Sequence, residues 1–357
     1  MWLIREEGTL TTLNRRLARR CVTIGQSCLR SRLTITRPQR LTSMAKSIDW
    51  AVNVDKLRVC YNMPENLYDY LRKHTTRYDE MTNARILDED DFSLVFIEED
   101  DTKMSAVLNV RDVDGFFRLG TFTFSNSAKY VGKAFFSFEN GALYRVYTRV
   151  PNGEPTNHIC DLMYVADFYG MTFNNVTELE LAFDSNYNYI SKVRKMIKDV
   201  ENYDLFLNGR KVTNDEKLDG YGEYYSRCRV KMSKLPTLYF SQAKETDMKM
   251  RIYDKAKELN ESSPQKTERL KTWLGWEDID TLFRVEVVLH NTNVREFVER
   301  YGERLYSEVG EHSNVLNLLG MSEFRTAMFL DSSDRMIYFR DKRTREKISL
   351  VEVCSGI

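Results

Sequence analysis

The chain has 357 residues, which is enough for one large or two ordinary domains with a sizeable core. Hydrophobic residues make up 42% of it and charged residues 30%, both normal for a soluble globular protein. The formal net charge is zero, but this does not exclude a nucleic-acid partner, because DNA binding needs only a local basic face.

The pattern of cysteines and histidines argues against several kinds of protein. The six cysteines are scattered and no two have CxxC spacing, and the four histidines never form a close pair. This argues against a zinc site and against a secreted domain held by disulfides. No apolar run approaches the length of a membrane span, so we expect no membrane partner. The composition favours a location in the reducing cytoplasm.

Residues 1–46 are strongly basic, with ten Lys or Arg against Glu6 and Glu7. A basic segment with several Ser and Thr is typical of a disordered DNA-binding arm and also of a transit peptide. It is equally what an extension upstream of a natural start at Met44 would look like. All three interpretations stay open, and we expect a disordered extension outside the folded part.

The folded part is expected to begin near residue 47, and its first half to end near residue 172. Alternating and helical apolar patterns follow one another there, with turn-prone pieces between them. The expected elements are a strand at 57–63, a helix at 65–73, an antiparallel meander over roughly 92–150 that ends in a β-run at 142–150, and a helix at 161–171.

A second half with strands and helices follows over residues 173–310, and residues 311–357 form a C-terminal extension with a weaker signal. The expected elements are a strand at 178–184, a helix at 189–200, a hairpin built on Asn208–Gly209, strands at 237–243, 248–255 and 283–291, and a helix that Asn293 caps. We therefore predict an α+β fold, an antiparallel sheet with helices packed on one face. An internally duplicated βα arrangement is one option.

Strand side chains alternate between the two faces of a sheet, so each strand of the second half has one apolar and one polar side. If these strands share one sheet, a single face collects carboxylates, tyrosines and cations. The residues expected on it are Glu178, Glu180, Asp184, Tyr239, Ser241, Lys249, Arg251, Tyr253, Lys255, Arg284, Glu286 and His290.

This set of side chains has a chemical interpretation. Carboxylates repel one another unless a cation holds them together, so a cluster of them predicts a hard divalent metal, which polarises a phosphodiester. A tyrosine becomes a nucleophile when a cation or base lowers the cost of its ionisation. Arg251, Lys255 and Arg284 are expected to hold phosphates. However, any half-exposed antiparallel sheet with solvated ion pairs alternates in this way, so periodicity alone leaves both interpretations open.

Three motifs in a fixed order resemble the replication initiation factor family. These are the rolling-circle Rep proteins of plasmids and phages, which are related to relaxases of conjugative elements. The motifs are TELELAFD at 177–184, TLYFSQAKETDMKMRIYDKAKE at 237–258 and RVEVVL at 284–289, and SIDWAVNV at 47–54 also looks like the start of the family. The resemblance covers about residues 47–300. It departs from the family at Ser241–Gln242, where a Gly-Ser is usual, and at Glu178, where an arginine is common.

The resemblance implies an enzyme that nicks one DNA strand at a replication origin. A tyrosine forms a 5′-phosphotyrosyl link, and the freed 3′-hydroxyl primes synthesis. Tyr253 matches the nucleophile, and Arg251 and Lys255 belong to the same motif. The matched metal ligands for Mg²⁺ or Mn²⁺ are Glu180, Asp184 and Glu286. The expected DNA contacts are Arg284, Lys249, Tyr239 and Ser241.

Some assignments have alternatives. Tyr239 is the reserve nucleophile. Asp254 ranks below the other acids because alternation points it away from Tyr253, unless the strand ends or bulges there. The whole chain is alternatively a non-catalytic DNA-binding protein, such as a repressor or origin marker, or a metal-dependent hydrolase that uses water. The expected partners are double-stranded or locally single-stranded origin DNA, a host helicase and the replication machinery. The sequence reveals no helicase domain of its own, because no GxxxxGK[ST] motif occurs. The sequence leaves open whether the protein is a homodimer.

Overall fold

The structure is a computed structural model. It describes residues 48–112, 115–145, 158–212, 237–241, 248–262, 264–276, 279–309 and 315–355. The basic segment 1–46 lies outside the described residues, and so do parts of the chain on both sides of the strand at 237–241.

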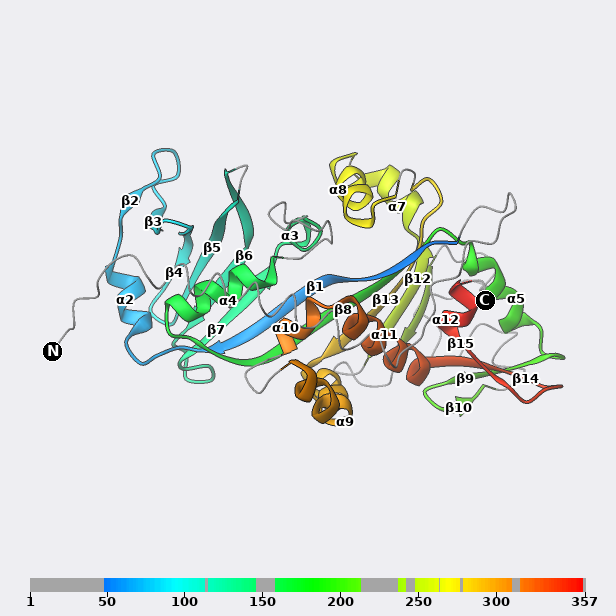
Figure 1. Cartoon of the computed structure of the whole chain (residues 1–357). Helices are drawn as coiled ribbons and strands as arrows, with labels where there is room; N and C mark the ends of the chain where they lie inside the picture. The colour runs from blue at the N-terminus through cyan, green and yellow to red at the C-terminus, as the bar shows by residue number, and fades with distance from the viewer. Residues whose placement is uncertain are drawn as a thin grey trace.

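An eleven-stranded antiparallel sheet forms the centre of the described part (Figure 1). Its two longest strands, β1 (Trp50–Asn62) and β8 (Thr172–Ser185), pair with each other in the middle. Beyond β1 lie, in order, β7 (Lys133–Phe138), β6 (Gly115–Ser125), β5 (Lys103–Asp112), β4 (Phe92–Glu99), β3 (Arg85–Asp88) and β2 (Arg77–Tyr78). Beyond β8 lie β13 (Phe283–His290), β12 (Lys249–Asp254) and β11 (Thr237–Ser241). The predicted α+β class with an antiparallel sheet is confirmed.

The strand order is symmetric about the central pair. A helix follows each central strand in the chain, α2 (Leu67–Lys73) after β1 and α5 (Tyr189–Lys198) after β8. Three later strands then fill the same positions in each half, β5–β6–β7 beside β1 and β11–β12–β13 beside β8. This arrangement agrees with the internal duplication that the alternation of β and α elements suggested.

One face of the sheet is apolar and packs against helices. Leu181 and Val285 are fully buried there, and the ring of Phe329 stacks on Phe183 at 5.5 Å. Burying each such side chain contributes about 1.5–3 kcal/mol, and a one-residue slip would turn the carboxylates inward, so this face fixes the strand register. Helices that contribute to this core include α2, α4 (Ile159–Phe168), α5, α9 (Asn291–Val309), α10 (Val315–Leu319), α11 (Ser322–Met336) and α12 (Leu350–Ser355), and Ala142 and Leu143 of a short helix at 140–143 join it as well.

Three further helices cover one end of the opposite, polar face. They are α3 (Asn140–Leu143), α7 (Lys255–Ser262) and α8 (Pro264–Leu274). Tyr144, Leu259, Leu270 and Trp273 form a separate small core between them. Tyr144 and Trp273 also hydrogen-bond to side chains of β1, which places these helices over the polar face.

A second, four-stranded sheet joins the middle of the chain to its C-terminal part. Its order is β10 (Arg210–Lys211), β9 (Tyr203–Leu207), β14 (Ile337–Asp341) and β15 (Lys347–Ser349). Asn208 and Gly209 have φ of 50° and 75°, as the predicted two-residue hairpin requires. Because β14 pairs with β9, residues 315–355 pack on the same body as the second half.

The structure corrects two local expectations. Ala142 and Leu143, expected in a β-run, lie in α3, and residues 146–150 of that run lie outside the described residues. Tertiary packing overrides local β-propensity here, since Ala142 and Leu143 are buried. Helix α9 begins at Asn291, and the Asn293 side chain accepts the backbone N–H of His290 at 3.0 Å instead of capping a later start. In the described part, no helix is long and apolar enough to cross a membrane.

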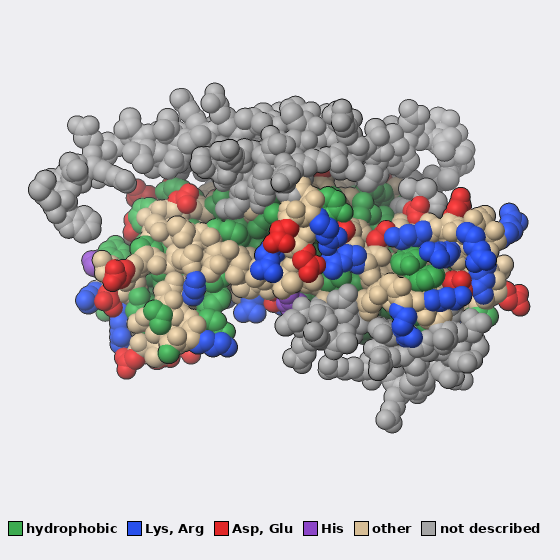
Figure 2. All heavy atoms as spheres, turned by 90° about the horizontal axis from the view of Figure 1, so that it is seen from below, with side chains coloured by type: hydrophobic (Ala, Val, Ile, Leu, Met, Phe, Trp, Pro, Cys, Tyr) green, Lys and Arg blue, Asp and Glu red, His purple; other side chains and the backbone are tan. Residues whose placement is uncertain are grey.

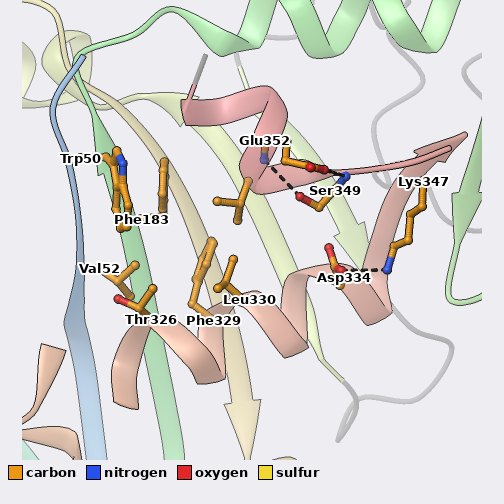
Figure 3. A pocket seen from close by; sticks show the side chains of 11 residues that line it. Trp50, Val52, Phe183, Thr326, Phe329, Leu330, Asp334, Lys347, Ser349 and Glu352 are labelled. Atoms are coloured by element: carbon orange, nitrogen blue, oxygen red, sulfur yellow. Dashed lines mark hydrogen bonds and ion pairs between the residues drawn. The ribbon is translucent and has the colours of Figure 1, made fainter. Parts of the chain in front are cut away.

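A cavity of about 380 Å³ lies on the apolar face, between α11, α12 and the ends of β1 and β8 (Figure 3). Trp50 stacks on Phe183 at 5.5 Å in its wall, and Asp334 and Lys347 form an ion pair of 2.7 Å beside it. Phe183 faces this cavity, and the next residue, Asp184, points to the other face of the sheet. The sheet therefore separates the cavity from the side chains of the polar face, to which Asp184 belongs.

Candidate active site

Strand pairing brings the predicted polar residues onto one face. Residues directly opposite each other in antiparallel strands point to the same side of a sheet. Arg251 of β12 lies opposite Glu286 of β13, and Tyr253 lies opposite Arg284. Arg284 in turn lies opposite Asp184 of β8. Residues that are up to about a hundred positions apart in the sequence therefore meet in one cluster.

The Tyr253 hydroxyl lies in direct contact with the Glu286 carboxylate. The Tyr253 hydroxyl donates to Oε1 of Glu286 at 2.5 Å, and Lys255 Nζ donates to the same hydroxyl at 3.3 Å. Burial raises the pKa of Tyr253, the negative charge of Glu286 raises it further, and Arg284 opposes both. The phenol is therefore protonated at neutral pH, and Glu286 is positioned to receive its proton.

Lys255 reaches the site from a helix and not from the strand. Strand β12 ends at Asp254, and Lys255 begins α7, where its Nζ also bonds to Glu258 at 2.7 Å. The Asp254 side chain accepts the backbone N–H of Lys257 at 3.0 Å, as a helix cap does. The strand ends at Asp254, so strict alternation does not apply to this residue, and its side chain caps α7.

Arg251 lies between two carboxylates. It donates to Oε1 of Glu180 at 2.8 Å and pairs through Nε with Oε2 of Glu286. Burial raises the pKa of Glu180, and so does the negative charge of Glu286, while Arg251 lowers it. The two glutamates thus repel each other, and a cation between them relieves that repulsion. The Arg251 side chain is 41% exposed, so it is open to a ligand from solvent.

Arg284 is the buried centre of the network. Its side chain is 1% exposed, and it holds Asp184 through two bonds, Nε to Oδ1 at 2.6 Å and a terminal nitrogen to Oδ2 at 2.8 Å. Its other terminal nitrogen donates to Oδ1 of Asp55 at 2.6 Å and lies 3.6 Å from Oε1 of Glu286. Burial disfavours the charge of Arg284, but Asp184 and its other acidic neighbours raise its pKa above the ordinary value.

Asp55 is a site residue that the sequence reasoning missed. Burial disfavours its charge, but Arg284 and the hydroxyl of Tyr144, which donates to it at 2.6 Å, bring its pKa below the ordinary value. The register of β1 against β8 shifts between Val54 and Lys56, where a bulge lets neighbouring side chains share the polar face. The sequence signal for this bulge is a break in the two-residue alternation of apolar side chains. The buried Val54 is followed by the buried Leu57, which is three residues later and not two.

A buried chain of hydrogen bonds joins α8 to this cluster. Trp273 Nε1 donates to Oδ1 of Asn53 at 2.8 Å, and Asn53 Nδ2 donates to Oδ2 of Asp184 at 3.2 Å. Asn53 and Asp184 are 3% and 0% exposed. Helix α8 therefore fixes Asp184 from the side opposite to Arg284.

We expect Trp273→Phe to lower the free energy of unfolding by about 1–3 kcal/mol, because the oxygen of the buried Asn53 amide loses its donor. Denaturant unfolding followed by circular dichroism measures the loss. Trp50→Phe is the matched control, since Trp50 is half-buried and stacks on Phe183 without a hydrogen bond to any described side chain. Equal losses in the two variants would show that ring packing, and not the bond to Asn53, explains the result.

The residues predicted to contact DNA occupy different environments. Tyr239 is 47% exposed, Lys249 is exposed, and both lie on the same face as Arg251. Ser241 lies opposite Lys249 in the β11–β12 pair. Arg284 is instead enclosed by carboxylates, which suits it to hold the site together and not to reach DNA.

The three predicted metal ligands differ in how well their surroundings suit a metal ion. Glu180 and Glu286 face each other across Arg251, and their mutual repulsion suits them to a hard cation. Asp184 does not fit, because it is fully buried and both of its oxygens bind Arg284. Across the described residues, no three His, Cys, Asp or Glu side chains are arranged to hold one metal ion.

Comparison with known proteins adds a distant structural likeness. No protein-family model matches the sequence, and no curated protein matches it significantly. One similar solved structure is a rolling-circle replication initiator protein from Geobacillus stearothermophilus. It is 15% identical, with 72% of this chain and 80% of that chain covered and a TM-score of 0.34. At these values the likeness does not extend to individual residues.

Proposed function

We propose that this protein nicks one strand of DNA through Tyr253 and starts rolling-circle replication at an origin. The observation that carries the proposal is the contact of 2.5 Å between the Tyr253 hydroxyl and Glu286, in a cluster that also holds Arg251 and Lys255. The motif resemblance to Rep proteins supports the choice of DNA as substrate.

Each residue of the cluster has a role in the proposed reaction. The Tyr253 oxygen attacks the phosphorus as its proton passes to Glu286, and the bond from phosphorus to the 3′-oxygen breaks. The electron pair stays on the 3′-oxygen, which takes up a proton and becomes the free 3′-hydroxyl. Lys255 lies beside the attacking oxygen, and Arg251 is exposed enough to bind the phosphate. The product is a 5′-phosphotyrosyl link.

A divalent cation, Mg²⁺ or Mn²⁺, belongs to the proposal as well. Glu180 and Glu286 are the two side chains that would hold it, for the reasons of charge given above. Such an ion supplies Lewis-acid polarisation of the phosphodiester when it is bound. Asp184 takes no part in the proposed site while Arg284 holds it.

The test uses the full chain with supercoiled DNA that carries the replicon, in Mn²⁺ or Mg²⁺. We expect nicked circles with protein attached at the 5′ end, visible as an SDS-resistant adduct, and no nicking in EDTA. Nicking without an adduct would instead identify a hydrolase that uses water. DNA binding that is unaffected by chelators, without cleavage, would identify a non-catalytic repressor or origin marker.

We expect Glu286→Gln to slow adduct formation by about 10²–10⁴-fold, because the amide cannot accept the phenol proton. Single-turnover assays with excess protein measure this rate. Glu258→Gln is the matched control, since Glu258 bonds to Lys255 but not to Tyr253. Equal rates in wild type and Glu286→Gln would remove Glu286 from the role of base.

A further inference from the structure

The two ends of the molecule carry opposite charge. One end is formed by α5, the β9–β10 hairpin and the β14–β15 hairpin (Figure 1). These segments, residues 189–211 and 337–349, hold eleven Lys or Arg against five Asp or Glu. At the other end of the long sheet, residues 77–101 hold two Arg against ten Asp or Glu. We call residues 189–211 and 337–349 the basic end. The net charge of zero thus hides a separation of charge along the molecule.

The outward face of the small sheet combines aromatic rings with cations. Phe206 and Tyr338 stack with their centroids 4.6 Å apart and their planes 7° apart, and both are half-buried. The Arg340 guanidinium lies 4.9 Å from the Phe206 centroid, and Lys347 Nζ lies 4.7 Å from that of Tyr338. The rings hold the cationic side chains on the surface of the sheet.

The turn of the β14–β15 hairpin presents further cations to solvent. Arg343 and Arg345 are exposed there, and Asp341 shapes the turn by accepting the N–H of Arg343 at 2.7 Å. On the neighbouring α5, Lys195 and Lys198 are exposed as well. Within the described part of the chain, Arg345, Lys195 and Lys198 form no ion pair. Figure 2 shows many Lys and Arg side chains gathered toward one end of the surface. Such uncompensated charge favours an anionic partner.

A groove of about 860 Å³ runs between α5 and this hairpin. Its cationic lining is Lys192, Lys195 and Lys347. Carboxylates of Asp199, Glu346 and Glu352 also line it. Asp199 already accepts a backbone N–H at 3.1 Å, and Glu352 accepts another. Lys347 is already paired with Asp334 at 2.7 Å, so among the lining cations the exposed Lys195 is open to a phosphate.

We infer that the basic end is a second DNA-binding surface, which holds the phosphate backbone of duplex DNA beside the nicking site. This inference rests on the proposed function. A protruding two-stranded ribbon fits the major groove of duplex DNA, and cations on both sides of it suit the flanking phosphates. Helix α5 begins at Tyr189, five residues after Asp184, so this surface is directly joined to the catalytic sheet. DNA repels the acidic end of the molecule, so this repulsion also turns the basic end toward DNA.

The test measures duplex binding without cleavage. Full-length Tyr253→Phe protein in EDTA is titrated into a fluorescent duplex of about 30 base pairs, with anisotropy followed between about 50 and 200 mM NaCl. The test variant carries Lys195→Ala, Lys198→Ala and Arg345→Ala. The control carries Lys73→Ala, Arg77→Ala and Lys129→Ala, which remove the same charge from exposed positions in the first half.

We expect the test variant to bind at least about tenfold more weakly, and its slope of log K against log salt to become shallower by about 2–3, near 0.9 for each lost phosphate contact. The control is expected to bind like the parent protein. Equal weakening in both variants, or an unchanged slope in the test variant, would overturn the inference. The inference would also be overturned if the test variant lost binding to anionic lipid vesicles but bound the duplex as the parent protein does.

The result is separable from that of the proposed function. Adduct formation on a single-stranded oligonucleotide that contains the nick site tests Tyr253 without the duplex surface. Loss of salt-dependent duplex binding with adduct formation intact identifies the basic end alone. Duplex binding without any adduct in the wild type would contradict the nicking proposal and leave the basic end in place.

Discussion

Tyr253→Phe is expected to abolish the protein–DNA adduct, with a loss of at least about 10⁴-fold in rate, because the attacking oxygen is gone. The fold should survive, since Glu286 keeps its pairing with Arg251 and lies 3.6 Å from Arg284. The lost hydrogen bond costs about 1–2 kcal/mol of the free energy of unfolding. A labelled DNA strand on a denaturing gel measures the adduct, and thermal unfolding measures the stability.

Tyr239→Phe is the control for this experiment. Tyr239 lies on the same face, opposite Arg251, and is 47% exposed, so its replacement tests whether any tyrosine near the cations suffices. We expect the adduct to form at the wild-type rate. Loss of the adduct in Tyr239→Phe, with normal adduct in Tyr253→Phe, would transfer the role of nucleophile to Tyr239.

Arg284→Ala is expected to lower the free energy of unfolding by about 3–5 kcal/mol at pH 7, because it leaves the buried carboxylates of Asp184 and Asp55 without their cation. Denaturant unfolding gives the value. Arg284→Lys keeps the charge but loses the forked geometry, so its free energy of unfolding should lie between those of the wild type and Arg284→Ala. It provides a measurable variant if the alanine variant does not fold. Arg58→Ala is the control, since its pair with Glu178 is half-exposed and contributes about 0–1 kcal/mol. A loss in Arg284→Ala no larger than in Arg58→Ala would contradict the prediction.

The loss in Arg284→Ala should shrink as the pH falls. In the wild type, the pKa of Asp55 lies below its unfolded value, so its stabilising contribution is present above the unfolded pKa and disappears as the pH falls through the folded one. Without Arg284, burial dominates and raises that pKa above the unfolded value. The folded variant then binds a proton more tightly than the unfolded chain, so acid stabilises it relative to neutral pH. Unfolding curves of both proteins at pH 7 and near pH 4.5 test this difference.

Much of the site follows from local patterns. The motifs around Glu180, Tyr253 and Glu286 lie on strands whose alternation of polar and apolar residues can be recognised in the sequence, because one face of each strand must be apolar to be buried. Once the structure places these strands side by side, the polar residues share one face. The α+β class and the Asn208–Gly209 hairpin were predictable for the same reason, since they depend on neighbouring residues.

Other parts depend on contacts between distant segments. Asp55 reaches the site through a bulge in β1, and Tyr144 through a short helix where a β-run was expected. Arg284 was expected to contact DNA, but its guanidinium is bound by Asp184 of β8 and Asp55 of β1. A residue's charge is visible in the sequence, whereas its partners and its distance from solvent are set by packing.

The basic end also depends on contacts between distant segments. Its two segments are separated by more than a hundred residues, and neither has a recognisable nucleic-acid motif. The pairing of β14 with β9 brings them together, because both strands bury their apolar sides against the same core. The sequence by itself determined which residues carry charge, which strands have a polar face and which tyrosine lies in a basic motif. Only the tertiary structure decided which carboxylates bind the buried Arg284 and which lie beside the half-exposed Arg251, because burial and pairing depend on segments that meet only in the fold.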